Sequence, residues 1–151
     1  MDQRTLLQII FLLVFIIPLI FFLLTLQNTL KVISFENRKM TPGNVWLIVI
    51  PFWGIVWQFV VVNRIADSIK EECIKLNIPV NENRPTYIIG LIYCISSILF
   101  LIPTIKTIGA FAGLILWILY WISVNKYKKL IEANKENYLL DAEREIFHTQ
   151  T

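Results

Sequence analysis

Residues 36–72 read ENRKMTPGNVWLIVIPFWGIVWQFVVVNRIADSIKEE, and this stretch decides the predicted fold. A polar segment leads into a Pro-Gly turn, an uncharged apolar run over residues 45–62 and then, without a break, a charged segment. The apolar run has the length of a short membrane-spanning helix. Thr41 and Pro42 precede it in the order expected of a helix N-cap and a first helical residue. We therefore expect a helix to begin here.

The pattern after this run predicts that the same helix continues into water. Ile65 and Ile69 begin an apolar face with helical spacing, and charged residues occupy the remaining surface. We therefore predict one continuous or gently bent helix over residues 45–76. Pro51 and Gly54 lie in its membrane half, where we expect a bend.

The composition of the whole chain indicates a membrane protein. Of 151 residues, 56% are hydrophobic and 17% are charged, against about 25% charged in a typical globular domain. Three further apolar runs cover residues 6–26, 87–105 and 108–124, and Pro18 predicts a kink in the first. The first run is too long for a signal peptide and lacks a small-residue cleavage site, so we interpret it as an uncleaved helix. The predicted fold is an all-α membrane protein, a single domain over residues 1–151, with four transmembrane helices in two hairpins.

The distribution of lysine and arginine predicts the orientation of these helices. The segment 63–86 and the C-terminal tail are rich in them, whereas the 27–44 loop has three and the 106–107 turn has one. We therefore expect both termini in the cytoplasm, with the 27–44 loop and the turn outside. Cytoplasmic helical extensions would follow the second helix and the fourth, the latter to about residue 147. The expected location is the inner (plasma) membrane.

Polar and aromatic residues of the second helix and its flanks are candidates for a functional contact. On a helical wheel Trp53, Trp57 and Arg64 fall in one stripe, which favours contact with a lipid headgroup or a partner. Interfacial anchoring, together with a local ion pair between Arg64 and Asp67, is the alternative interpretation. Gln58 is predicted to form an interhelical hydrogen bond. The candidate contact residues are Arg38, Trp53, Trp57, Gln58, Asn63, Arg64 and Asp67.

Small residues on the last two predicted helices indicate close helix packing. Gly90, Cys94 and Ser97 share one face of the third helix, and Gly109 and Gly113 form a GxxxG pair on the fourth. We predict that these faces meet within the second hairpin, because close backbone approach stabilises helix pairs in lipid. Self-association of the fourth helix is the alternative.

The opening stretch also resembles a known kind of protein. Its features are the polar Glu36-Asn37-Arg38 loop, Pro42-Gly43, Trp46, Ile50-Pro51 and the exit Arg-Ile-Ala-Asp-Ser at residues 64–68. This pattern is similar to that of small multi-pass bacterial inner-membrane proteins of unknown function, and it covers about a quarter of the chain. The resemblance implies a bacterial membrane setting and no particular activity. The tail after Lys126 lies outside the pattern.

Motifs for catalysis are lacking in the sequence. The predicted membrane helices contain no Asp, Glu, Lys, Arg or His, which argues against an ion-coupled transporter. Neither a hydrolase nor a nucleotide-binding motif is present, and Cys73 and Cys94 are not spaced for a metal site. We expect no catalytic residue, metal or cofactor, and membrane lipids rather than nucleic acid as contacts of the basic residues.

The predicted function is that of a non-enzymatic integral membrane protein, an accessory or partner-binding component that uses its cytoplasmic helical extensions. A protein partner or a homo-oligomer is expected in addition to membrane lipids. The alternative is a small permeation or lipid-handling protein, monomeric or homo-oligomeric.

Overall fold

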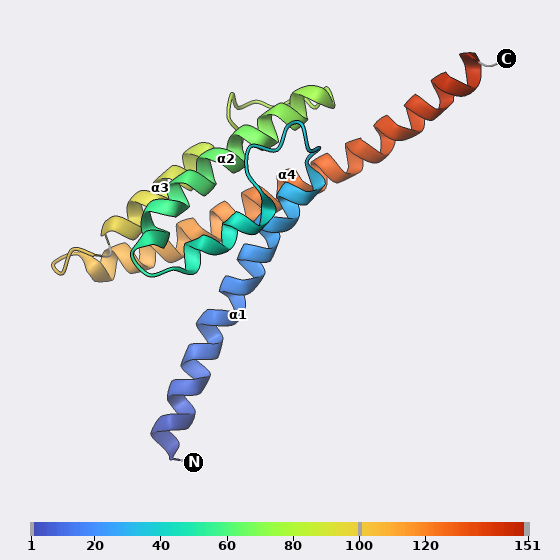
Figure 1. Ribbon diagram of the computed structural model, residues 1–151. Helices are drawn as coiled ribbons and strands as arrows, with labels where there is room; N and C mark the ends of the chain where they lie inside the picture. The colour runs from blue at the N-terminus through green and yellow to red at the C-terminus, as the bar shows by residue number, and fades with distance from the viewer. Residues whose placement is uncertain (1, 100, 150–151) are drawn as a thin grey trace.

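The computed structural model describes residues 2–99 and 101–149, and within them the chain is helical without any strand (Figure 1). The predicted all-α class is therefore confirmed. The elements, in chain order, are α1 (Gln3–Val32), the 3-10 helix η1 (Pro42–Val49), α2 (Trp53–Lys75), α3 (Tyr87–Leu99) and α4 (Lys106–Thr149).

Two of these helices are candidates for crossing a membrane. Gln3–Val32 and the Lys106–Leu140 part of α4 are long and apolar enough to do so. By contrast, α3 has 13 residues, about 20 Å at 1.5 Å per residue, and falls short of a hydrocarbon core of about 30 Å. The prediction of four spanning helices is thus not supported. The third apolar run was predicted to be helical over residues 87–105, but α3 ends at Leu99 and residues 101–105 form turns and a bend.

The second predicted helix is broken within its apolar run. η1 begins after Thr41 with Pro42 in its first turn, as predicted, but it is a 3-10 helix and ends at Val49. Pro51 then removes a backbone donor, and Phe52 adopts a φ of 62°, outside the right-handed helical region. The chain reverses here. The predicted continuous helix over residues 45–76 is therefore wrong, while the site of its distortion was predicted correctly.

The reversal makes η1 and α2 an antiparallel hairpin (Figure 1). Next to the turn the two arms lie very close, since a Cβ on Gly54 would overlap a backbone carbonyl of η1. At the open end, the backbone N–H of Lys39 donates to Ser68 Oγ at 2.8 Å. The 27–44 loop and the end of α2 therefore lie at the same end of the molecule. The prediction that the loop is outside the membrane and the end of this helix is in the cytoplasm is therefore wrong.

The core lies where the C-terminal half of α1 meets α2 and α4. The apolar face predicted for α2 is enclosed, with Ile65 and Ile69 fully buried. Leu26 of α1 and Ile131 of α4 belong to the same buried cluster. The N-terminal half of α1 diverges from this body, and α4 runs past it at the other end (Figure 1).

Candidate functional site

A buried carboxylate attaches the loop before η1 to α2. Glu72 is 0% exposed, and its two carboxylate oxygens accept hydrogen bonds from Ser34 Oγ and Asn37 Nδ2, both at 2.7 Å. Such donors make a buried carboxylate tolerable in a protein interior. Sequence reasoning missed Glu72, although a signal existed. It stands seven residues after Ile65, and so falls on the apolar face of the helix.

Two basic side chains close the C-terminal end of α1. Arg38 Nη2 donates to the carbonyls of Lys31 and Ile33 at 3.3 and 3.1 Å. Lys135 Nζ, from α4, donates to the carbonyl of Val32 at 2.9 Å. Cations here satisfy carbonyls that lack helical partners and complement the negative end of the helix dipole. The candidate contact residue Arg38 thus has a structural role.

Asn63 and Asp67, two of the predicted contact residues, converge on Arg84 in the segment before α3. Arg84 Nη2 lies 2.7 Å from Asp67 Oδ1 and donates to Asn63 Oδ1 at 3.0 Å. Its guanidinium also lies 4.1 Å from the centroid of the Tyr87 ring. Asp67 therefore pairs with Arg84 rather than with Arg64, whose side chain is exposed. The local ion pair predicted from sequence spacing is replaced by one between two segments.

Trp53 and Trp57 stack on each other, with ring centroids 6.1 Å apart. Trp57 Nε1 donates to the carbonyl of Asn44 at 2.8 Å, which ties α2 to η1. The predicted stripe of Trp53, Trp57 and Arg64 therefore divides in two. The aromatic pair stabilises the hairpin, and the exposed cation lies about two helical turns further along.

The small-residue faces of α3 and α4 meet, with a pairing that differs in detail from the prediction. Gly113 of α4 faces Ser96, whose Oγ would lie 3.3 Å from an added Cβ. Gly90 of α3 faces Val62 of α2 and Tyr120 of α4, whose nearest atoms would lie 2.5 and 2.8 Å from an added Cβ. Gly90 therefore sits at a junction of three helices.

The interhelical hydrogen bond predicted for Gln58 is confirmed. Gln58 Nε2 of α2 donates to Ser97 Oγ of α3, and Ser97 Oγ donates to the carbonyl of Cys94 at 2.7 Å. Cys94 is fully buried beside this chain of contacts. These polar groups satisfy one another, which is typical of helix packing in an apolar environment.

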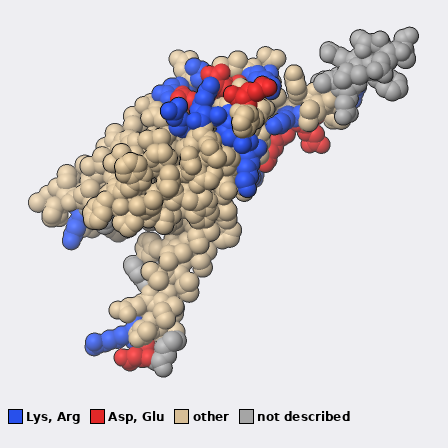
Figure 2. Space-filling view, in the orientation of Figure 1, with Lys and Arg blue, Asp and Glu red and all other residues tan. Residues whose placement is uncertain are grey.

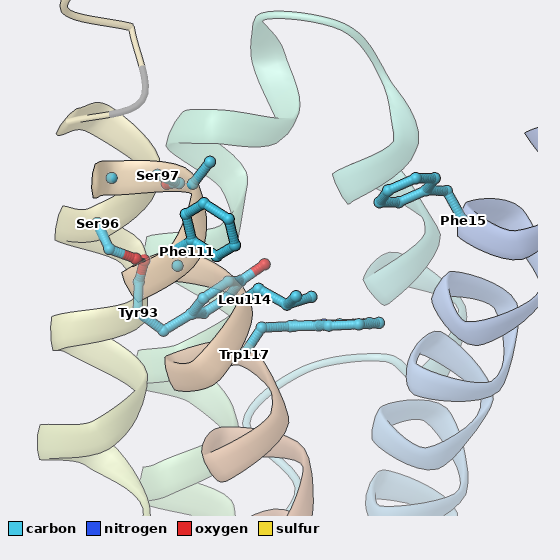
Figure 3. Close-up of a pocket in the computed structure, with 10 residues that line it drawn as sticks. Phe15, Tyr93, Ser96, Ser97, Phe111, Leu114 and Trp117 are labelled. Carbon is cyan, nitrogen blue, oxygen red and sulfur yellow. Dashed lines mark hydrogen bonds between the residues drawn. The ribbon is translucent and has the colours of Figure 1, made fainter. Parts of the chain in front are cut away.

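An apolar pocket of about 420 Å³ opens between α1 and the α3–α4 hairpin (Figure 3). Phe15 of α1 faces Trp117 across it, and Tyr93 lines it from α3. Gly109 and Gly113 also line it, and their lack of side chains leaves room. Among the described residues that line the pocket there is no Asp, Glu, His, Lys, Arg or Cys. Its lining is mainly apolar, with the hydroxyls of Tyr93, Ser96 and Ser97 as its polar side-chain groups.

The distal part of α4 presents apolar side chains that no other element covers within the described chain. Tyr138 and Leu139 are 50% and 56% exposed, and Leu140 is also exposed. In Figure 1 this part of the helix extends well beyond the body.

No group of three or more His, Cys, Asp or Glu in the described part of the chain could hold a metal ion. Comparisons with protein-family models, curated proteins and solved structures find no match. Functional proposals for the chain therefore rest on its own geometry and charge.

Proposed function

We propose that the protein is a non-enzymatic integral membrane protein that binds a protein partner through the distal part of α4. The observation that carries this proposal is a difference between the two extensions expected from the sequence. Ile65 and Ile69 of α2 are fully buried within the chain itself, whereas Tyr138 and Leu139 of α4 are about half exposed. Apolar side chains left uncovered on a helix outside the bilayer are typical of an interaction surface.

The exposed residues continue a buried stripe of α4. Val124, Ile131 and Tyr138 follow one another at seven-residue spacing, so they share one side of the helix. Val124 and Ile131 are fully buried, whereas Tyr138 is 50% exposed. The apolar side of α4 thus continues past the residues that other helices of the chain cover. This supports a face that is open to a second protein.

Charge selects among the occupants of this face. An anionic lipid surface would repel the net negative charge of residues 132–145. A second copy in the same membrane would align its α4 in parallel and oppose two acidic segments, which is also unfavourable. The proposed partner is therefore a protein with a basic surface lined by apolar side chains. The charged residues of this segment are, by sequence, Glu132, Glu136, Asp141, Glu143 and Glu145 against Lys135 and Arg144.

Basic residues support one orientation in the membrane. Twelve of the fourteen Lys and Arg, all in the described part of the chain, lie in the 27–44 loop, in α2, in the segment before α3 or in the C-terminal part of α4. Hydrogen bonds and an ion pair join these segments at one end of the molecule, and α4 continues beyond it. The other two are Arg4, in the first turn of α1, and Lys106, the first residue of α4. In Figure 2 the blue basic side chains gather at one end of the body, and small blue patches mark tips away from it. The cytoplasmic bias of basic residues favours placing the basic end inside. With α1 crossing once, the proposed arrangement has the N-terminus outside and the C-terminus inside, in the bacterial inner membrane that the resemblance implies.

Photo-crosslinking in cells tests the partner surface. A benzoylphenylalanine replacing Leu139 is expected to give a defined protein adduct, and one replacing the exposed Asn137, about 200° around the helix, is expected to give none. The double variant Glu132→Lys/Glu136→Lys should weaken the adduct, because the partner surface is basic. Equal yields at both positions, or an adduct of only two copies of this chain, would refute the proposal.

Cysteine labelling tests the orientation. Phe35→Cys and Ile74→Cys are expected to react with a membrane-impermeant maleimide only after the cells are opened. Thr5→Cys is expected to react in intact cells. Labelling of Phe35→Cys and Ile74→Cys from opposite sides would exclude the reversal at Pro51 and restore the topology expected from the sequence.

A lipid-handling role is the second candidate, and the pocket beside Trp117 is the observation that favours it. Its apolar lining and opening between α1 and the hairpin suit an acyl chain. Liposomes that contain the protein should then exchange labelled lipid faster than empty ones, and Gly113→Leu, which fills the pocket, should remove the difference. Equal rates with and without the protein would exclude this role.

A further inference from the structure

We propose that the loop between α1 and η1 binds the headgroup of an anionic phospholipid, with Arg38 and Lys39 holding its phosphate. The loop contains a pocket of about 300 Å³, lined by Phe35, Arg38, Lys39, Met40, Thr41 and Pro42. This volume is at the lower end of the range for ligand sites and is enough for a phosphate and its glycerol. The site shares the membrane setting proposed above but does not depend on the α4 surface.

Hydrogen bonds to α2 fix the loop on both sides of its tip. Ser34 and Asn37 donate to the buried carboxylate of Glu72, and the backbone N–H of Lys39 donates to Ser68 Oγ. A loop attached in this way loses little conformational freedom when a ligand binds. Its two cations are therefore presented from a preorganised backbone.

The charge of Arg38 is not neutralised by its protein contacts. Its Nη2 donates to the backbone carbonyls of Lys31 and Ile33, which are neutral groups. Its Nε is buried and has no acceptor among the described residues. The guanidinium thus has no acidic partner among the described residues, and such a group favours an oxyanion.

Neighbouring carboxylates are engaged elsewhere. Glu36, on the loop itself, lies 3.5 Å from Lys75 Nζ, and Glu72 accepts from the two loop side chains already described. Within the described residues, no acidic side chain pairs with Arg38 or with the exposed Lys39. A phosphate would supply the counter-charge that the chain does not.

The position of the loop selects a lipid headgroup over a dissolved anion. α1 is uncharged from residue 5 to residue 30 and Lys31 is its next charge, so the loop begins where the apolar span ends. Phe35 lines the pocket and is 86% exposed. An aromatic ring at this depth enters the headgroup region of a bilayer. The phosphate next to such a ring is that of a membrane lipid.

Lipid titration of the detergent-solubilised full-length chain, read by native mass spectrometry, tests the site. Phosphatidylglycerol is expected to bind more tightly than zwitterionic phosphatidylcholine. Lys39→Glu should weaken phosphatidylglycerol binding about fivefold or more, the scale of one basic residue at a membrane surface. Lys129→Glu makes the same change in net charge at an exposed position of α4, and should change the affinity less than about twofold. Lys39→Gln, with an intermediate loss, keeps the test valid if the charge reversal impairs folding.

Four results would overturn the inference. Equal losses in Lys39→Glu and Lys129→Glu would mean diffuse charge attraction rather than a site. Displacement of phosphatidylglycerol from the wild-type chain by excess inorganic phosphate would assign the pocket to a dissolved anion. If the chain requires detergent but binds phosphatidylglycerol no more tightly than phosphatidylcholine, the headgroup site alone is overturned. If the chain stays soluble without detergent, the proposed membrane setting is overturned as well.

Discussion

Replacement of Glu72 tests the hairpin most directly. Its carboxylate is fully buried in α2 and accepts hydrogen bonds from Ser34 and Asn37, which precede it by 38 and 35 residues. These contacts exist only if the chain reverses between the loop and α2. Removing either side of the contact should therefore change stability in a way that a straight helix would not.

The expected magnitudes follow from burial. A hydrogen bond to a charged group contributes about 1.5–3 kcal/mol. Since water partly replaces the acceptor at the half-buried donors, Glu72→Ala should lower the free energy of unfolding by about 2–3 kcal/mol. Ser34→Ala/Asn37→Ala leaves the carboxylate buried and unpaired, which costs about 3–5 kcal/mol. The triple variant removes that unpaired charge, and should be more stable than the double variant by about 1–2 kcal/mol.

Thermal unfolding of the detergent-solubilised protein, followed by tryptophan fluorescence, measures these differences. In a chain of this length 1 kcal/mol shifts Tm by about 2–4 °C. Glu72→Ala should thus lower Tm by about 5–10 °C, and the double variant by more. A triple variant no more stable than the double variant would show that the two donors do not hold the carboxylate, and would refute the reasoning that joins the loop to α2.

Three further predictions concern close packing and thiol chemistry. Gly54→Ala should destabilise the protein by about 2 kcal/mol or more, because its Cβ would overlap the Ile48 carbonyl, whereas Gly43→Ala, with open space around it, should stay within about 0.5 kcal/mol. Gly90→Ala should lower the free energy of unfolding by about 1–2 kcal/mol, because its Cβ would overlap Val62 and Tyr120. Gly113→Ala should lower it by less than half as much, since the nearest atom would lie 3.3 Å from the added Cβ. The free energies of unfolding of all four variants can be compared by chemical denaturation. Burial, and then the charge of Glu72, raise the pKa of Cys73 from 9.0 to about 11. Its thiolate fraction at pH 8 is therefore about a hundredfold below normal, and alkylation followed by mass spectrometry should be slower by at least that factor than in Ile74→Cys, at the exposed neighbouring position. Comparable rates at both positions would contradict the burial of Cys73.

Patterns within short stretches of the sequence correctly predicted two helices, the buried face of a third and one interhelical hydrogen bond. Uncharged runs of sufficient length identified α1 and α4, and the spacing of Ile65 and Ile69 identified the buried face of α2. Gln58 was recognised because a polar amide in an apolar helix needs a partner, and Ser97 supplies it. The helices and the buried face are determined by residues within a few helical turns of one another. The hydrogen bond of Gln58 could be predicted without knowing its partner, because any nearby acceptor or donor would satisfy the amide.

Proline shows where local reasoning ends. Pro18 lies inside α1, and the helix continues through it, whereas Pro51 lies in a similar apolar run and the chain reverses. The residue type is the same, so its local effect cannot account for both outcomes. Phe52 has a positive φ in the hairpin, an unfavourable conformation for an aromatic residue that persists only where surrounding contacts stabilise it. At the open end of the same hairpin, Ser34 and Asn37 donate to Glu72 from 38 and 35 residues away in sequence.

The same residues could have indicated the reversal by a different argument. A glutamate on the apolar face of an amphipathic helix is either exposed, which breaks the face, or buried, which requires donors. Ser34 and Asn37 provide those donors only if the polar loop and the end of α2 lie at the same end of the molecule. That arrangement also moves the three basic residues of the loop onto the side that already has most of the others, leaving only Arg4 and Lys106 opposite. The pairing of a buried carboxylate and the asymmetry of basic residues are independent constraints. In the membrane setting proposed above, both favour a hairpin whose two ends lie on the same side.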